Sequence, residues 1–454
     1  MLIPPATAVT ADRPAHRDPN VLRWLGAYAS SMVGDSVYYI ALSWAAVQAG
    51  SPSQAGLVMS VSALPRALLM LGGGVIADRL GPRRVVIGSD AVRCAAVLGV
   101  AALVFLTSPG LWPLALLALV FGAVDAVFMP AVGALPARIT GKGQLARVQG
   151  MRGLAIRFAN VVGAPLGGLC VAVGGAAAAF GLAGLLIAVS VPLLLTVRVR
   201  DLPAGEEAGA DVRDLPAGEE AGADVRDLPA GEEAGADVRD LPAGDEAGAN
   251  RTTAWSDLSA GLRYIRHHRV LAPLMLAIAL GDFGFVGPLN VGLTLLADER
   301  GWGASGMGWV LAGFGVGAGT VSLLLTVRGR LPHAGLVAAY AILAGSVAIG
   351  ALAYVPSVVA AVGVALLIGL LAGLSGAMCG ALLQTQADPA YLGRVTAVAG
   401  LVSLGFAPLS MPFAAAAIQA WGTGPVFVVS AAVCGLGGVV ALSVRALRQA
   451  ELPR

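Results

Sequence analysis

Long apolar runs, separated by short polar segments, follow one another along almost the whole chain. A helix rises about 1.5 Å per residue, so a run of about 20 residues crosses the roughly 30 Å hydrocarbon core of a bilayer. Backbone polar groups find no water in lipid, and each run is therefore expected to form a helix. The pattern predicts an all-α membrane protein with twelve spans, at 23–48, 55–77, 85–106, 112–134, 149–173, 176–197, 270–296, 305–327, 334–354, 357–384, 394–420 and 423–445.

Positive charge alternates between the loops of this arrangement. One set of loops and the two tails are basic, with Arg79, Arg83, Arg84, Arg138, Lys142, Arg147, Arg152, Arg251, Arg263, Arg266, Arg269, Arg328, Arg330, Arg394, Arg13, Arg17, Arg23, Arg445, Arg448 and Arg454. The loops of the opposite set carry Arg300 as their single basic residue. Basic loops stay in the cytoplasm, so both termini and the long central loop are predicted to be cytoplasmic in a multi-pass protein of the plasma membrane. This parity requires an even number of spans.

The central segment divides the spans six and six. It repeats RDLPAGEEAGADV three times from Arg200, adds an altered copy from Arg239, and holds fifteen of the 27 acidic residues. Such a composition cannot bury a core, so a disordered tether is predicted, with a specific docking segment as the alternative. The predicted divisions are a disordered cytoplasmic tail at 1–22, a first bundle at 23–197, a cytoplasmic linker at 198–269 with the acidic repeats at 200–249, a second bundle at 270–445 and a tail at 446–454.

The two halves also echo each other. Gly34–Asp35 lies about a dozen residues into the first span, and Gly281–Asp282 lies at the same depth in the seventh. Paired six-helix halves are the build of one major class of transporter folds. The sequence therefore predicts two pseudo-symmetric six-helix bundles.

Composition narrows the class of function. The chain is 57% hydrophobic and 12% charged, against about 25% charged in soluble domains. Its basic residues sit in short loops and form no continuous face, which argues against a nucleic-acid partner. The lone cysteines match no disulfide or metal pattern, and G-x-x-x-x-G-K-[ST] is absent, so no cofactor and no use of ATP are expected. No motif of a membrane-embedded enzyme is present either.

The strongest local motif is GGGVIADRLGPRR at residues 72–84, between the second and third spans. Gly74 permits close helix approach, and the acid Asp78 sits at a helix end, where it can meet a cation or a helix N-terminus. Gly81 begins a tight turn with Pro82. Three arginines, Arg79, Arg83 and Arg84, hold that turn at the cytoplasmic surface.

This segment resembles the signature loop of the major facilitator superfamily, G-x-x-x-D-R-x-G-x-R-R in form. NVVGAPLGG at residues 160–168 resembles the fifth-helix Gly-Pro motif of the family's drug–proton antiporters, in Gly163, Pro165, Gly167 and Gly168, although Ala164 separates the first glycine from the proline. GDSVYYIALSW and LGRVTAV resemble the branch that contains enterobactin and macrolide exporters. The resemblance implies the major facilitator fold, alternating access, efflux and a monomer.

Two departures limit what the resemblance implies. The antiporters' fourth-helix motif with its basic residue is missing, and the fourth span carries Asp125 instead. The loop between the eighth and ninth spans has only Arg328–Gly329–Arg330, so the second half lacks the acidic latch that Asp78 supplies in the first. Proton coupling therefore cannot be inherited from those motifs.

Charged residues at membrane depth are costly and usually face partners or a cavity. Asp35 and Arg66 lie at matching depths in adjacent spans, and so do Asp125 and Arg157. We expect two ion pairs, or one shared polar cluster, with a structural role or a role in gating or substrate binding. Asp90 and Arg93, three residues apart, are expected to pair along their helix. Weaker candidates for a central cavity are Tyr38, Tyr39, Trp44, Asn160, Asn290, Gln384 and Gln386.

Asp282 differs because its own half offers no obvious cation at its depth. Burial disfavours the charged form of an unpaired acid, so this carboxyl could carry a proton across or contact a cationic substrate. The alternative is a neutral acid that is hydrogen-bonded in a helix contact. Asp282 is the leading single candidate for proton coupling.

The favoured function is a secondary active, proton-coupled exporter of a drug, an antibiotic or a siderophore. Its partners would be that small molecule, protons and the lipid bilayer. The alternatives are an importer of a small metabolite and a membrane receptor or scaffold that transports nothing.

Overall fold

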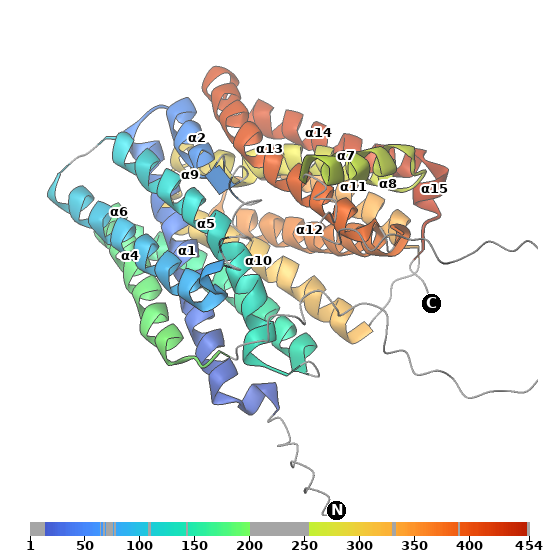
Figure 1. Ribbon diagram of the computed structural model, residues 1–454. Coiled ribbons are helices and arrows are strands. Elements are labelled where there is room, and N and C mark those ends of the chain that lie inside the picture. The colour runs from blue at the N-terminus through green and yellow to red at the C-terminus, as the bar shows by residue number, and fades with distance from the viewer. Residues whose placement is uncertain are drawn as a thin grey trace, which may run out of the picture.

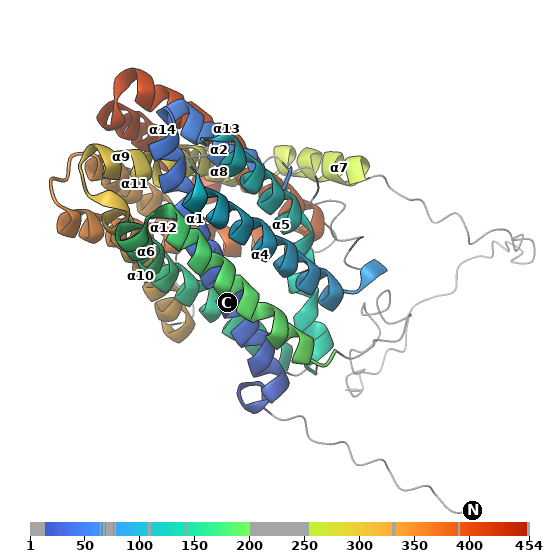
Figure 2. The same cartoon turned by 90° about the vertical axis from the view of Figure 1, so that its left-hand side faces the viewer.

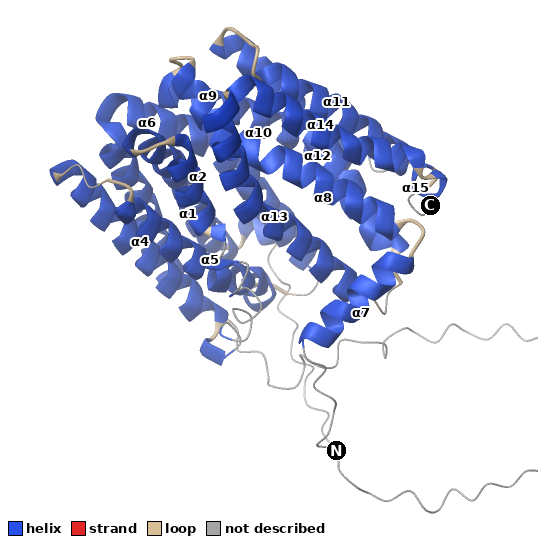
Figure 3. Ribbon diagram, turned by 90° about the horizontal axis from the view of Figure 1, so that it is seen from above, coloured by secondary structure: helices blue, strands red, loops and turns tan. Residues whose placement is uncertain are grey.

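The computed structural model describes residues 14–63, 65–66, 69, 76, 79–107, 110–141, 144–199, 254–328, 333–388 and 391–451. Every regular element in these ranges is a helix, and none is a strand (Figure 3). Eight of the described helices are long and apolar enough to cross a membrane. The acidic repeats at 200–249 lie outside the described residues, so the disorder predicted for them stays a prediction.

The first half of the chain forms helices that correspond to the first six predicted spans. They are α1 (Pro19–Ala49), α2 (Pro52–Val61), α4 (Pro82–Leu106), α5 (Trp112–Ile139) and α6 (Leu145–Thr196). α6 holds two spans, because Gly175 inside it has a φ of 71° and a non-helical conformation that glycine adopts without steric cost. α1 and α4 pack against α6, and α4 packs against α5.

The second half supplies the other six spans. They are α8 (Leu271–Gly287) with η3 (Pro288–Gly292) and α9 (Leu293–Glu299), then α10 (Gly303–Arg328), α11 (Ala334–Leu352), α12 (Val358–Gln386), α13 (Leu392–Trp421) and α14 (Thr423–Ser443). α8, η3 and α9 form one continuous span in which η3 is a π-helical turn, a feature that often marks functional sites. Figure 1 shows the blue-to-green helices on one side of the molecule and the yellow-to-red helices on the other.

Local sequence sets several helix starts. Proline opens α1, α2 and α4, where its fixed φ suits the first turn and its missing N–H needs no partner. Ser51 and Gln54 form a capping box at α2. The side chain of Asp18 accepts from the Asn20 amide at the start of α1.

Two boundaries differ from the sequence prediction. The tail predicted to be disordered through residue 22 is helical from Pro19, because Asp18 and Pro19 together start α1 inside that range. The predicted linker 198–269 contains a further helix, α7 (Ala254–His267). α7 packs against α13 and lies at the edge of the molecule (Figure 2). A search for membrane-length apolar runs did not find α7, because it has 14 residues and is apolar on one side only.

Candidate functional site

Arg93 of α4 lies at the centre of a buried charge cluster in the first half. Its side chain is 0% exposed. One of its terminal nitrogens donates to Asp35 of α1 at 2.8 Å and lies 3.3 Å from Asp125 of α5. The other donates to Asp90, one turn away, and to Ser31 of α1 at 3.2 Å. The Arg93 guanidinium also stands 4.0 Å from the centre of the Phe128 ring.

Arg66 completes this N-terminal charge cluster, which we define as Asp35, Arg66, Asp90, Arg93 and Asp125. It donates to Asp125 and, at 3.2 Å, to the Tyr39 hydroxyl. The cluster therefore sets three carboxylates against two guanidiniums. Asp35 Oδ1 is buried without a hydrogen-bond partner among the described residues.

The structure contains the shared polar cluster that was one of the two predicted alternatives, for Asp35, Arg66 and Asp125 but without Arg157. The individual ion pairs differ from the predicted ones. Asp35 pairs with Arg93 rather than Arg66, and Asp125 pairs with Arg66 and Arg93 rather than Arg157. The pair of Asp90 and Arg93 forms as predicted. Matching the depth of residues along neighbouring spans showed which charges lie at the same level of the membrane. The rotation of each helix about its axis, which the sequence does not show, decides which of those side chains meet. Arg93 was missed as the centre because its near neighbour Asp90 already accounted for its charge.

The second half contains a cavity of about 780 Å³. Its described lining residues from the second half come from α8, α10, α11, α12, α13 and α14. Most are apolar or small, and the hydroxyl groups are those of Ser322, Ser375, Thr396 and Ser403. Such a mixture, apolar walls with a few polar groups, is typical of a binding site for a small molecule.

Two charged residues line the cavity within the described part of the chain. Asp282 of α8 accepts a hydrogen bond from Ser403 Oγ of α13 at 2.6 Å. Arg157 of α6 is the single lining residue from the first half among those described. Its side chain is exposed and makes no ion pair with a described residue. Arg157 and Asp282 are called the cavity charges below.

The cavity reaches toward the end of the molecule where the arginine-rich loops lie, called the arginine-rich end below. Leu383 lies three residues before the end of α12, and Thr396 lies four residues after the start of α13. The cavity charges lie 12 and 11 residues from the starts of α6 and α8. At about 1.5 Å per residue, both are about 16–18 Å from that end.

The two halves are closed against each other at the opposite end. A Cβ added to Gly56 of α2 would lie 2.3 Å from Ala415 of α13. Gln48 Nε2 of α1 donates to Asp298 Oδ1 of α9 at 2.8 Å, and the Ser53 amide donates to Gln419 of α13 at 3.3 Å. The described contacts thus join the halves at one end and leave a cavity toward the other.

The fifth-helix Gly-Pro motif contributes to this closure. Gly163 and Gly167 face Ser36 and Ile40 of α1, within the same half. A Cβ on Gly168 would lie 2.4 Å from the Ala304 carbonyl oxygen of α10. Reciprocally, a Cβ on Gly308 of α10 would lie 2.5 Å from the Ala164 carbonyl oxygen, beside Pro165. The motif therefore packs both within its own half and across to the other.

The signature loop is only partly described. Gly74 and Asp78 lie outside the described residues, so the latch predicted for Asp78 stays a prediction. Gly81 has a φ of 83°, as a tight turn requires. Arg83 donates to the carbonyl oxygens of Leu194 and Leu195 at 3.3 and 2.6 Å, where it satisfies the end of α6. Arg79 and Arg84 are exposed.

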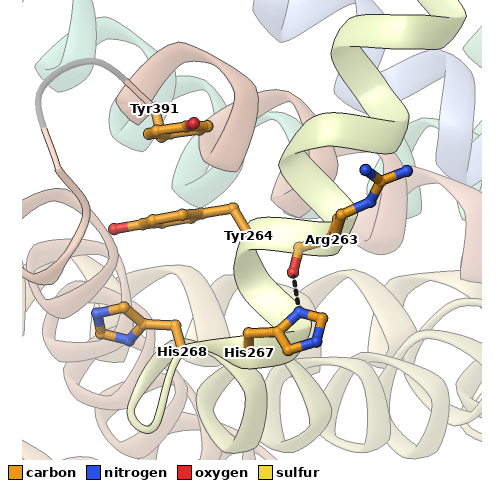
Figure 4. Close-up of a pocket in the computed structure, with 5 residues that line it drawn as sticks. All are labelled: Arg263, Tyr264, His267, His268 and Tyr391. Atoms are coloured by element: carbon orange, nitrogen blue, oxygen red, sulfur yellow. Dashed lines mark hydrogen bonds between the residues drawn. The ribbon is translucent and has the colours of Figure 1, made fainter.

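A second, smaller pocket of about 400 Å³ lies beside α7 (Figure 4). Tyr264 of α7 stacks on Tyr391, just before α13, with ring centres 4.4 Å apart. The Tyr264 hydroxyl accepts from the Asp388 amide at 3.1 Å, and His268 Nδ1 accepts from the first amides of α8. His267 Nδ1 donates to the Arg263 carbonyl oxygen at 2.8 Å, the dashed line in Figure 4. These contacts fix α7 to the second half.

The weaker sequence candidates do not line the larger cavity. They are Tyr38, Tyr39, Trp44, Asn160, Asn290, Gln384 and Gln386. Tyr38 is buried and stacks on Phe121 within the first half. Asn290 donates to the Val286 carbonyl oxygen along its own helix. Their sequence pattern could not show which helix faces turn toward the cavity.

Two helical halves, joined at one end, with a cavity toward the other end that is lined by Asp282 and Arg157, are the build of a membrane transporter. The model of the Major Facilitator Superfamily matches residues 24–410, and the chain belongs to that family.

Among curated proteins, the chain is similar to the multidrug efflux pump Tap of Mycobacterium bovis and Mycobacterium tuberculosis. Identity is 35% over 190 residues, which cover 39% of this chain and 45% of Tap. The match thus spans less than half the length of these relatives.

Solved transporters share the fold across nearly the whole chain. The nucleoside transporter NupG aligns with a TM-score of 0.66 at 13% identity and covers 94% of this chain and 100% of its own. A POT family transporter in complex with 5-aminolevulinic acid has a TM-score of 0.64 at 12% identity, covering 93% and 95%. A D-xylose–proton symporter has 0.62 at 14%, covering 96% of each chain. At these identities the likeness establishes the fold alone.

Proposed function

We propose that this transporter is a proton-coupled exporter of medium-sized, partly hydrophobic molecules such as drugs, antibiotics or siderophores. The observation that carries the proposal is the cavity of about 780 Å³, whose mostly apolar wall holds the carboxylate of Asp282. A site of this kind suits an amphiphilic small molecule better than a sugar, which needs many polar partners. The partial likeness to the Tap efflux pump supports export.

In an alternating-access cycle, this conformation corresponds to the state that is open toward the arginine-rich end. The arginine-rich end is the predicted cytoplasmic end by the positive-inside rule. The cavity in this conformation would therefore load substrate from the cytoplasm, or from the inner leaflet, while the opposite end is closed. Release would require the contacts of Gly56, Gly168 and Gly308 to separate as the two halves rock.

Two places can hold a proton in this scheme. Asp282 faces the cavity with one hydroxyl partner, Ser403, so a proton can reach it. The N-terminal charge cluster has one more carboxylate than guanidinium, and a proton on Asp35 would balance that charge. Each place holds a carboxylate that the cations of the described residues do not fully neutralise, which makes both places candidates for coupling.

Import of a small metabolite is the second candidate. The same fold occurs in a D-xylose–proton symporter, so the fold is compatible with import as well as with export. Direction separates the two functions. A strain that lacks the gene is challenged with antibiotics, dyes and siderophores, and intracellular accumulation is measured.

Export predicts higher accumulation of at least one compound in the deletion strain and its reversal by the restored gene. Lower uptake of a nutrient in the deletion strain, with no change for any toxic compound, would show import instead.

A further inference from the structure

The larger cavity carries one charge of each sign, and each charge comes from a different half. Arg157 is on α6 of the first half, and Asp282 is on α8 of the second. Every other described lining residue is uncharged. Their equal depth, 12 and 11 residues from their helix starts, sets them at one level of the cavity.

Neither charge is neutralised by a described protein group. Arg157 has no ion pair there, in contrast to Arg66 and Arg93, which both have carboxylate partners. Asp282 has the hydroxyl of Ser403 and no cation within ion-pair distance among the described residues. Charges at membrane depth are normally paired unless they face a cavity that water or a ligand fills. These two are therefore open to a ligand.

The other residues that line the cavity determine the chemistry of the part of a ligand that lies between the two charges. The rings of Phe285 and Phe314, whose centres are 5.7 Å apart, lie on α8 and α10. Ile278, Ile349 and Ile368 add aliphatic surface. A ligand that fills this space has an apolar, preferably aromatic, body.

We propose that the preferred substrates are zwitterionic amphiphiles, with a cationic group on Asp282 and an anionic group on Arg157. This inference rests on the proposed function, since it assigns a substrate class to the same cavity. A purely cationic molecule leaves Arg157 unpaired and places a second positive charge in its cavity. A purely anionic molecule leaves Asp282 unpaired and places a second negative charge there. A zwitterion satisfies both and bridges the two halves.

Rhodamine B and its ethyl ester test this assignment, because they differ only in whether the carboxylate is free. Binding of each dye to the purified full-length protein in lipid nanodiscs is followed by fluorescence anisotropy. We expect the free acid to bind about tenfold more tightly than the ester, the factor that one charge-assisted contact supplies. Arg157→Gln should remove that preference by weakening the free acid alone. Asp282→Asn should weaken both dyes.

Arg147→Gln is the matched control, since Arg147 is an exposed arginine of the same helix that does not line the cavity. It should keep the preference of the wild type. Equal binding of the two dyes by the wild type, or a preference that Arg157→Gln leaves intact, would overturn the assignment. If the ester is nevertheless exported by cells, the proposed function survives that result. If the deletion strain accumulates no tested compound above the wild-type level, the proposed function itself fails.

Discussion

The N-terminal charge cluster and the cavity charges lie at similar membrane depth, but only the charges of the cluster form ion pairs among the described residues. Arg93 is fully buried and forms ion pairs with three carboxylates, so its charge is neutralised within the first half. Arg157 lines a cavity and has no described partner. A charge at membrane depth therefore does not by itself mark a transport site. Whether the protein has already neutralised that charge is the better guide.

The largest effect should come from removing the centre of the cluster. Arg93→Met leaves Asp35, Asp90 and Asp125 with Arg66 alone. Loss of one partner of a buried ion pair costs about 3–5 kcal/mol, so unfolding in detergent should shift to much lower temperature. Thermal unfolding of the purified protein measures this.

Arg157→Met is the matched control for that stability test. It removes the same charge from a site without a described partner, so stability should stay within about 0.5 kcal/mol. If both variants unfold at the wild-type temperature, the cluster does not stabilise the first half as described.

An intermediate effect should follow from forcing the closed end apart. Gly308→Leu places a side chain against the Ala164 carbonyl oxygen, and overpacking of this kind costs about 1–3 kcal/mol. The conformation with a closed opposite end should lose population about tenfold, and transport should fall with it. Solvent labelling of a cysteine at Ser53, in cells, reports that opening.

Gly319→Leu on the same helix is the control, because a Cβ there meets nothing within 4 Å. It should leave both labelling and transport near the wild-type level. Labelling of Gly308→Leu that matches the wild type would show that the closure does not depend on this contact.

The smallest effect should come from the hydroxyl beside Asp282. Ser403→Ala removes one hydrogen bond to the carboxylate, worth about 1 kcal/mol, and should change the KM of transport about fivefold with the fold intact. Ser375→Ala is the control, since Ser375 lines the same cavity but donates to its own helix at Ala372. Equal KM values for the two variants would show that Ser403 does not position Asp282.

Much of the fold followed from the sequence, for physical reasons. Span positions depend on length and hydropathy alone, so α5 and α14 fall close to their predicted ranges. Helix α7 was not predicted because its 14 residues are too few to cross a membrane. The two spans of α6 were separable because Gly174–Gly175 interrupts the apolar run.

The site was only partly predictable. The sequence predicts the approximate depth of a residue along its helix, and by depth it matched Arg157 with Asp125 and not with Asp282. It does not give helix rotation, so Arg157 was assigned to Asp125 of its own half. Asp282 was singled out because no cation lies at its depth in the second half, and comparison across the halves would have found Arg157.

In the proposed mechanism, Asp282 in this cavity couples substrate movement to protons. The most direct measurement is dye transport into proteoliposomes with an imposed pH gradient, for the wild type and Asp282→Asn. We expect gradient-driven accumulation by the wild type and only equilibration by the variant, with dye exchange across the membrane retained. Gradient-driven accumulation by Asp282→Asn at the wild-type rate would contradict it.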